Sequence, residues 1–140
     1  MKLKILNLSS NQDFNFAPAH LWDAGFDLRS NQYKILHPGE RTVIQTGLCF
    51  EIERGHEGQI RPRSGLTNKR IDVFLGTIDC NYRGEVGIQI QNNSKEDFII
   101  ESGDRIAQVV FLKLPDVEIE FVNELEPSTR NGGFGHTGIK

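Results

Sequence analysis

The stretch Glu85-Val86-Gly87-Ile88-Gln89-Ile90-Gln91 decides the fold class, because its apolar and polar residues alternate strictly after Gly87. Successive side chains of a β-strand point to opposite faces, so Val86, Ile88 and Ile90 would share one face. The pattern therefore predicts a strand with one buried side and one solvent-facing side.

Short apolar runs of the same kind recur along the chain, and turn signals rich in Gly, Pro, Asn and Asp separate them. The helical signal is weak: residues 64–70 are expected to form one turn or a short helix, with Ser64 as its cap. Many short strands at this spacing predict an all-β domain, as a sandwich, jelly roll or barrel. Besides residues 85–91, we expect strands at residues 1–8, 42–52 (one strand, or two divided at Gly47), 58–62, 98–100, 106–114 and 117–122.

Length and composition restrict the classes of partner. A chain of 140 residues is one domain that can bury a core without disulfides. With a net charge of −3, the chain lacks the excess of Lys and Arg that binds a nucleic-acid polymer through its phosphates. A single nucleotide is not excluded as a ligand. The chain shows no signal peptide and no apolar run of membrane-span length, so we expect an intracellular protein with no membrane partner. Cys49 and Cys80 are expected to be free thiols in a reducing compartment.

The C-terminal segment, residues 130–140, is rich in glycine, with four glycines among residues 132–138. Such a stretch loses too much backbone entropy to form a stable helix or strand. It nevertheless carries Arg130, Phe134 and Thr137, which are groups suited to gripping a phosphate chain and covering a flat base. We therefore expect a β-domain over residues 1–126 and a flexible C-terminal lid over residues 127–140.

Two further segments combine groups that could form a site, although each has an ordinary structural explanation. Arg63 offers a bidentate fork for phosphate beside Ser64 at a helix start, but a surface turn with a capping serine is equally consistent. Asp79 and Tyr82 could place a general base and a ring in one pocket. Taken alone, these two are better explained as a turn cap and a half-buried hairpin aromatic.

Polar residues also interrupt two apolar segments. Asp27 lies between Phe26 and Leu28, and an inward-facing carboxylate must pair with a cation or bind a metal. A structural ion pair is the favoured interpretation on this evidence. Arg105 and Gln108 interrupt a hydrophobic strand and would need polar partners nearby, although single polar residues on strands more often face solvent.

Taken in order, five segments resemble the five motifs of the trimeric dUTPase family. The resemblance implies a distorted jelly-roll (β-clip) subunit and a homotrimer with three shared active sites. One chain would supply motifs one, two and four, its neighbour motif three, and the third chain the tail. It also implies hydrolysis of dUTP to dUMP and diphosphate with Mg2+, which keeps uracil out of DNA and supplies dUMP for thymidylate synthesis. The segments are residues 24–30, 63–67, 76–87, 103–111 and 130–138.

The resemblance also implies roles for the residues of the motifs. Asp79 corresponds to the general base that activates the attacking water, and Gln108 to the glutamine that helps to hold this water. Tyr82 corresponds to the ring beneath the deoxyribose, where a 2′-hydroxyl finds no room. The backbone positions that read the uracil edge correspond to Gly76, Thr77 and Gly87.

The remaining matches concern the phosphates and the metal. Asp27 corresponds to a carboxylate that acts on Mg2+ through its water shell. In the tail, Arg130 corresponds to the arginine on the γ-phosphate and Phe134 to the ring over the uracil. The residues matched to other phosphate contacts are Arg63, Ser64 and Gly65, and those matched to the terminal-phosphate cradle are Gly135, His136 and Thr137.

The chain departs from the family pattern at a few points. Only Asn131 separates Arg130 from Gly132, where two residues are usual, and this puts the reach of Arg130 in doubt. His136 replaces a frequent serine, residues 80–81 lack a frequent acidic residue, and the segment between residues 66 and 76 is short. Two alternatives stay open: a dCTP deaminase or bifunctional deaminase–pyrophosphatase using Glu85, and a non-catalytic nucleotide-binding regulator. The expected compartment is the cytoplasm, or also the nucleus for a eukaryotic or viral source.

Overall fold

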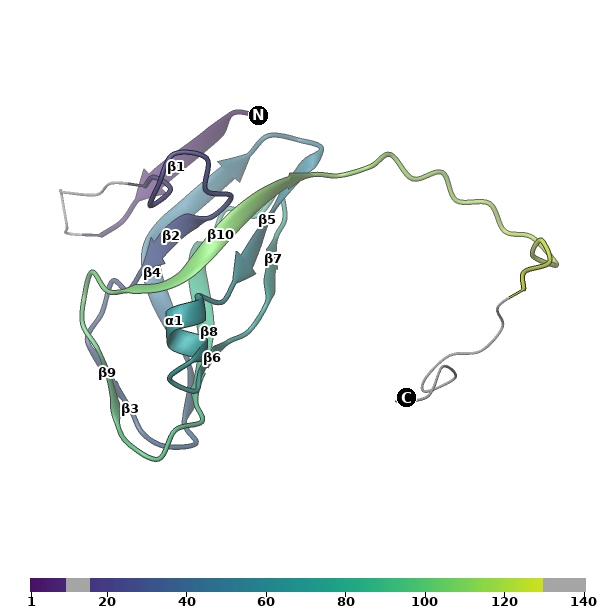
Figure 1. Cartoon of the computed structure of the whole chain (residues 1–140). Helices are drawn as coiled ribbons and strands as arrows, with labels where there is room; N and C mark the ends of the chain where they lie inside the picture. Colours follow the sequence, from purple (N-terminus) through teal and green to yellow (C-terminus); the bar gives the residue numbers. More distant parts are fainter. Residues whose placement is uncertain (10–15, 130–140) are drawn as a thin grey trace.

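The computed structural model describes residues 1–9 and 16–129, so the residues assigned to the glycine-rich tail, 130–140, lie outside the described part. Within it, two four-stranded antiparallel sheets and one two-stranded sheet form the domain (Figure 1). The first sheet has the order β1(Leu3–Asn7), β4(Arg41–Ile52), β8(Glu85–Asn92), β6(Ile71–Val73). The second has the order β2(Phe26–Arg29), β10(Arg105–Lys113), β5(His56–Arg61), β7(Gly76–Ile78). The third pairs β3(Lys34–Leu36) with β9(Phe98–Ile100).

The hydrophobic core draws its side chains from all three sheets. Alternation in β8 buries Val86, Ile88 and Ile90, as the sequence predicts. Burying a side chain of this size stabilises the fold by about 1.5–3 kcal/mol. The expected all-β fold is therefore confirmed. Other members of the buried cluster are Leu28, Leu36, Ile44, Phe50, Ile100 and Val109.

The expected strand 42–52 is one strand with an irregularity at Gly47. The pairing of β4 with β8 shifts register between Gln45 and Cys49, and Gly47 has a φ of 73°, which favours glycine. The backbone groups at this point find partners, because the Gly47 carbonyl accepts a hydrogen bond from the Leu8 amide at 2.7 Å. The Gly47 amide in turn donates to the Glu85 carboxylate at 2.7 Å.

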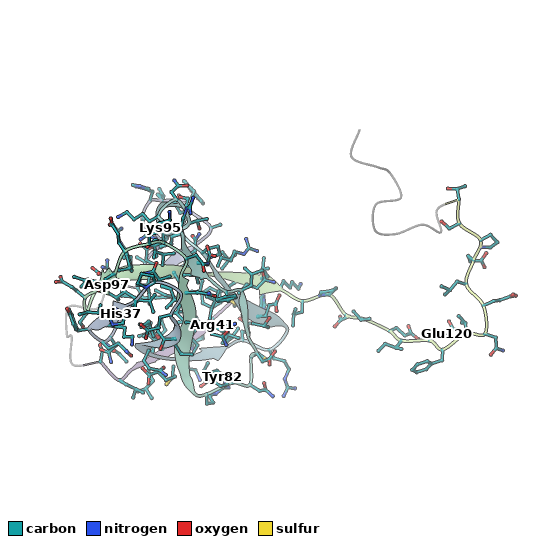
Figure 2. All side chains as sticks on the ribbon, turned by 90° about the horizontal axis from the view of Figure 1, so that it is seen from below. His37, Arg41, Tyr82, Lys95, Asp97 and Glu120 are labelled. Atoms are coloured by element: carbon teal, nitrogen blue, oxygen red, sulfur yellow. The ribbon has the colours of Figure 1, made fainter. Side chains whose placement is uncertain are left out.

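The expected strand 117–122 is wrong. Residues 114–129 contain no strand, and they extend away from the domain as a single segment on which Glu120 lies (Figures 1 and 2). Val117, Ile119 and Phe121 are exposed, the last to 96%. Alternation determines which side chains share a face, but a strand also needs a neighbour for its hydrogen bonds. None of the described strands lies beside this segment.

The short elements show smaller differences. The helix α1(Ser64–Thr67) is a single turn, and its N-cap is Arg63 rather than the predicted Ser64. Two strands, β3 and β6, have only three residues each, which is too short for alternation to reveal. A third, β7, lies in a segment that the sequence describes as a turn.

No helix within residues 1–9 and 16–129 is long and apolar enough to cross a membrane. Cys49 and Cys80 are free thiols, as predicted.

Candidate active site

The central strand β10 brings polar residues from three strands into one row. Gln108 lies opposite Asp27 of β2 on one side and opposite Arg61 of β5 on the other. Residues directly opposite in an antiparallel sheet project from the same face. All three line one open cleft of about 600 Å³, which we call the arginine cleft. The rest of its lining includes Asp23, Gly25, Arg63, Ser64, Gly65 and Lys69.

Asp27 is the anion that organises the arginines of this cleft. Its Oδ1 lies 3.1 Å from Arg63 Nε, and its Oδ2 lies 3.4 Å from Arg105 Nη1. The carboxylate is only 15% exposed, so two cations compensate for much of its lost hydration. The ion pair favoured from the sequence is therefore present, and the partner expected for Arg105 is Asp27.

Arg63 is held on both sides. Besides the pair with Asp27, its Nη1 donates to the Arg105 carbonyl oxygen at 2.9 Å. This holds the guanidinium at the point where α1 begins, next to Ser64 and Gly65. A Cβ at residue 65 would meet nothing within 4 Å, so this side of the cleft is open to a ligand.

Gln108 is packed against the backbone at Gly25. A Cβ at residue 25 would collide with the amide oxygen of Gln108 and would lie 2.9 Å from its Cδ. The amide nitrogen donates to the Pro62 carbonyl oxygen at 2.9 Å, which is the polar partner that the sequence led us to expect. Glycine at residue 25 thus leaves the space that the Gln108 amide occupies.

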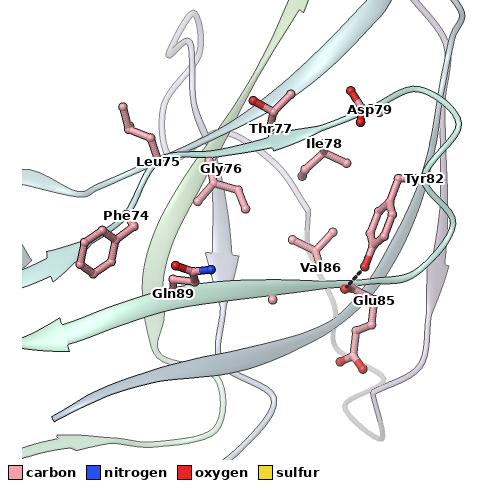
Figure 3. Close-up of a pocket in the computed structure, with 12 residues that line it drawn as sticks. Phe74, Leu75, Gly76, Thr77, Ile78, Asp79, Tyr82, Glu85, Val86 and Gln89 are labelled. Carbon is pink, nitrogen blue, oxygen red and sulfur yellow. Dashed lines mark hydrogen bonds between the residues drawn. The ribbon is translucent and has the colours of Figure 1, made fainter.

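A second cleft of about 210 Å³ lies between β7 and β8, and we call it the hairpin cleft (Figure 3). It forms because β7 belongs to one sheet and β8 to the other, so the two strands separate after their connecting turn. The strand β7 is held to β5 through pairs such as Thr77 with Gln59. The cleft is lined by Ile60, Phe74, Leu75, Gly76, Thr77, Ile78, Asp79, Tyr82, Glu85, Val86, Gly87 and Gln89.

Asp79 and Tyr82 share this hairpin cleft. The Tyr82 amide donates to the Asp79 carbonyl oxygen at 3.0 Å, which closes the turn, while the Asp79 side chain stays exposed. The Tyr82 hydroxyl donates to the Glu85 carbonyl oxygen at 3.0 Å (Figure 3). Tyr82 is 45% exposed and so offers an accessible surface to a ligand.

Glu85, the candidate base of the alternative deaminase, has a structural partner. Its Oε1 accepts the Gly47 amide at 2.7 Å. In Figure 3 its carboxylate points away from Asp79 and Thr77. A carboxylate bonded in this way is occupied in stabilising the irregular part of β4.

The structure thus divides the predicted site residues into two groups, and no described residue lines both clefts. The arginine cleft holds Asp27, Arg63, Ser64, Gly65 and Gln108. The hairpin cleft holds Gly76, Thr77, Asp79, Tyr82 and Gly87. The remaining predicted residues, Arg130, Phe134, Gly135, His136 and Thr137, lie outside the described residues.

Sequence reasoning missed several polar residues of the clefts, among them Arg61 and Gln89. Arg61 is a further cation in the arginine cleft, and its Nη2 donates to Gln59 Oε1 at 2.9 Å. Gln89 lines the hairpin cleft, and its Oε1 accepts from Arg41 Nη2 at 2.6 Å. Strand register, had it been known, would have placed Arg61 beside Gln108.

The donor set of the arginine cleft fits Mg2+ only loosely. No group of three or more His, Cys, Asp or Glu residues gathers anywhere in the described ranges. Asp27 is already paired with two arginines, so it suits a contact through water better than direct ligation. Mg2+ commonly keeps several waters and bridges substrate phosphates, so a dense carboxylate cluster is not required.

Comparison with known proteins identifies the family. The family model named dUTPase matches residues 13–138. The chain belongs to the dUTPase family. It is 49% identical to the deoxyuridine 5′-triphosphate nucleotidohydrolase of Nautilia profundicola and 43% identical to that of Finegoldia magna, and each alignment covers 99% of both chains.

Solved dUTPase structures share the fold. A dUTPase of Staphylococcus bacteriophage 80alpha, solved as a mutant with dUpNHpp, superposes with a TM-score of 0.85 at 28% identity over 99% of both chains. A mutant dUTPase of phage phi11 of S. aureus, described with a structural Mg(II) ion, gives a TM-score of 0.81 at 28% identity. That alignment covers 89% of this chain and 98% of the phage chain. The resemblance drawn from the five motifs is confirmed at the level of the dUTPase family.

Proposed function

We propose that this protein hydrolyses dUTP to dUMP and diphosphate. Its membership of the dUTPase family is the observation that carries the proposal. The two clefts support it, because one presents backbone groups and a ring that suit a deoxynucleoside, and the other presents arginines that suit a triphosphate. The reaction would keep dUTP out of DNA synthesis and supply dUMP for thymidylate synthesis.

The base would be read in the hairpin cleft by main-chain groups. Backbone N–H and C=O groups at Gly76, Thr77 and Gly87 can pair with the edge of uracil as a complementary base would. A narrow hairpin would exclude the methyl group of thymine sterically. The amino group of cytosine would leave polar groups unpaired, which is the stronger ground for rejection.

The reaction needs a base, an attacking water and compensation of phosphate charge. We assign the role of general base to Asp79, whose carboxylate is exposed in the hairpin cleft. Gln108 of the arginine cleft would form a hydrogen bond with the attacking water. Asp79 would take a proton from the water as the water oxygen adds to the α-phosphorus. The bond from the α-phosphorus to the bridging oxygen would break and release diphosphate. Arg63 would bind the phosphates with Ser64 and Gly65.

Mg2+ would be bound mainly by the substrate phosphates, with Asp27 contacting its water shell, and it would neutralise charge on the departing diphosphate. Before substrate binds, Asp27 would hold Arg63 in place through the 3.1 Å ion pair.

We further propose a homotrimer in which each active site combines chains. The supporting observation is that the base Asp79 and its partner Gln108 line different clefts of the same subunit. A hairpin cleft of one chain facing the arginine cleft of the next would unite them, and residues 130–140 of the third chain would supply Arg130 and Phe134. Light scattering should give the mass of three 15.8 kDa chains, and a dimer mass would count against the proposal.

The deciding experiment measures diphosphate released from dUTP, with dTTP, dCTP and UTP as controls. Rapid release from dUTP alone supports the proposal. Ammonia released from dCTP would instead favour the deaminase, although the bond from the Gly47 amide to Glu85 speaks against that function. Tight dUTP binding without turnover would favour a non-catalytic regulator. We place the reaction in the cytoplasm, which the two free thiols support.

A further inference from the structure

We propose that Gly84 is a positioning residue that sets the sugar selectivity of the hairpin cleft, because it leaves the space into which the Tyr82 ring folds. The inference rests on the proposed function, in which Tyr82 lies beneath the deoxyribose. It adds a residue that touches no substrate and acts through the ring.

The space at Gly84 is already filled by the tyrosine. A Cβ built at residue 84 would lie 2.6 Å from Tyr82 Cζ and 3.0 Å from Cε2, and it would collide with the hydroxyl oxygen. Carbon atoms in van der Waals contact normally stay about 3.5–4.0 Å apart. The Tyr82 ring therefore packs over residue 84, which is the only glycine among residues 79–85 of this turn.

Backbone conformation does not explain the need for glycine here. Four described glycines have positive φ values, namely Gly39, Gly47, Gly55 and Gly103, and Gly84 is not among them. The φ of residue 84 thus lies outside the left-handed region that favours glycine. The three atoms nearest to a Cβ at this position all belong to the Tyr82 side chain, which is therefore in the way of any side chain here.

A hydrogen bond holds the ring at the same hydroxyl end that meets Gly84. The Tyr82 hydroxyl donates to the Glu85 carbonyl oxygen at 3.0 Å, so the ring spans residue 84 from one side to the other. Arg83 Nη1 donates to the carbonyl oxygens of Cys80 and Tyr82, at 2.8 and 2.9 Å, which holds the turn itself. The ring height at the cleft is therefore set by the contact with Gly84, on a turn that is already rigid.

A methyl group at residue 84 should move the ring and leave the fold intact. Tyr82 is partly exposed, so the ring can rotate toward solvent without opening the core. A raised or rotated ring would no longer lie where it excludes a 2′-hydroxyl. Discrimination between dUTP and UTP depends on that exclusion, so selectivity should fall.

The test compares Gly84→Ala with the wild-type enzyme. We expect the ratio of kcat/KM for dUTP to that for UTP to fall at least about tenfold, which corresponds to about 1.4 kcal/mol of discrimination. Asn81→Ala is the matched control, because Asn81 is an exposed residue of the same turn that lines neither cleft. A Gly84→Ala variant that keeps the wild-type ratio would overturn the inference.

A double-mutant cycle tests whether the effect passes through the ring. In a Tyr82→Ala background there is no ring to displace, so adding Gly84→Ala should not change the dUTP/UTP ratio further. An equal loss of selectivity in both backgrounds would overturn the positioning role.

A spectroscopic measurement separates this inference from the proposed function. The chain has two tyrosines, Tyr33 and Tyr82, so tyrosine-labelled protein gives two ring signals in NMR. Gly84→Ala should shift the Tyr82 signal and leave the Tyr33 signal unchanged, and an unchanged Tyr82 signal would overturn the inference. If wild-type protein fails to release diphosphate from dUTP, the proposed function falls, whereas the ring signal still reports on the contact.

Discussion

Asp27 and Arg63 form an ion pair of 3.1 Å that joins the strand β2 to the start of α1. The pair lies in the arginine cleft, where Asp27 also meets Arg105 at 3.4 Å. One carboxylate therefore determines where two guanidinium groups lie before any phosphate binds.

Replacing Asp27 with Asn should weaken both the fold and substrate binding. The variant keeps the side-chain shape but leaves two arginines without their anion, and we expect a loss of about 1–3 kcal/mol in the free energy of unfolding. The KM for dUTP should rise, because Arg63 loses its fixed position. Chemical denaturation and steady-state kinetics measure the two effects. Asp116→Asn, an exposed change outside both clefts, is the control, and equal behaviour of the two variants would contradict the prediction.

A methyl group at Gly25 should disable Gln108 by occupying the space of its amide. In Gly25→Ala the new Cβ would collide with the Gln108 amide oxygen, and the amide would have to leave the Pro62 carbonyl. We expect kcat to fall about 100-fold with a smaller change in KM, because the attacking water loses a hydrogen-bonding partner. The variant Gln108→Ala should show a similar loss, and combining the two changes should cost little more. Full additivity in this cycle would refute the link.

Replacing Asp79 with Asn should abolish turnover and leave nucleotide binding largely intact. The amide has nearly the same shape but cannot accept the proton of the water, and removal of a general base typically costs about 10²–10⁴ in rate. Diphosphate release measures turnover, and calorimetric titration with dUMP measures binding. Near-normal turnover would assign the base to another residue.

Deleting residues 130–140 should leave the domain folded and nearly inactive. The core cluster lies wholly within the retained residues, so the unfolding midpoint should hardly change. Activity should fall because the deletion removes Arg130 and Phe134, which we expect to bind the terminal phosphate and cover the base. Single variants Arg130→Ala and Phe134→Ala would divide the loss between these two contacts. An active deletion variant would argue against the lid.

Surface carboxylates should make the fold less stable in acid. The hydrogen bond from Lys34 lowers the pKa of Glu40, and Lys4 likewise lowers the pKa of Glu51. A carboxyl whose folded pKa lies below its unfolded value stabilises the fold above the unfolded pKa, and this contribution disappears as the pH falls through the folded pKa. The loss should therefore begin near the ordinary value of 4.5 and continue below it. Thermal unfolding of wild type and Glu40→Gln should be measured over a series of pH values, and the two unfolding midpoints should converge in acid. A difference between the midpoints that does not change with pH would contradict a stabilising role for the Glu40 carboxylate.

Sequence patterns predicted those elements that the chain can specify locally. The alternation of residues 85–91 was sufficient because one face of β8 lies on the core. The same alternation at residues 117–122 predicted a strand that does not form. A strand needs a neighbouring strand for its hydrogen bonds, and none of the described strands pairs with these residues. β7 escaped notice because its three residues, Gly76–Ile78, are too few to show a period, and its pairing with β5 is a tertiary contact.

The candidate site shows the same division. The motif order identified the family and named some residues of each cleft, but it could not show that Asp27, Gln108 and Arg61 stand in one row. That row depends on the register of three strands distant in sequence. Nor could it show that Gly25 and Gly84 are needed for the side chains that fold over them.

The separation of the two clefts on one subunit has a genetic consequence. If active sites are shared between chains, an Asp79→Asn chain still carries a sound arginine cleft, and an Arg63→Ala chain still carries a sound hairpin cleft. Two such null alleles, expressed together, can complement each other by forming mixed assemblies. Two alleles damaged in the same cleft cannot, so the pattern of rescue between alleles would map the clefts without any structure determination.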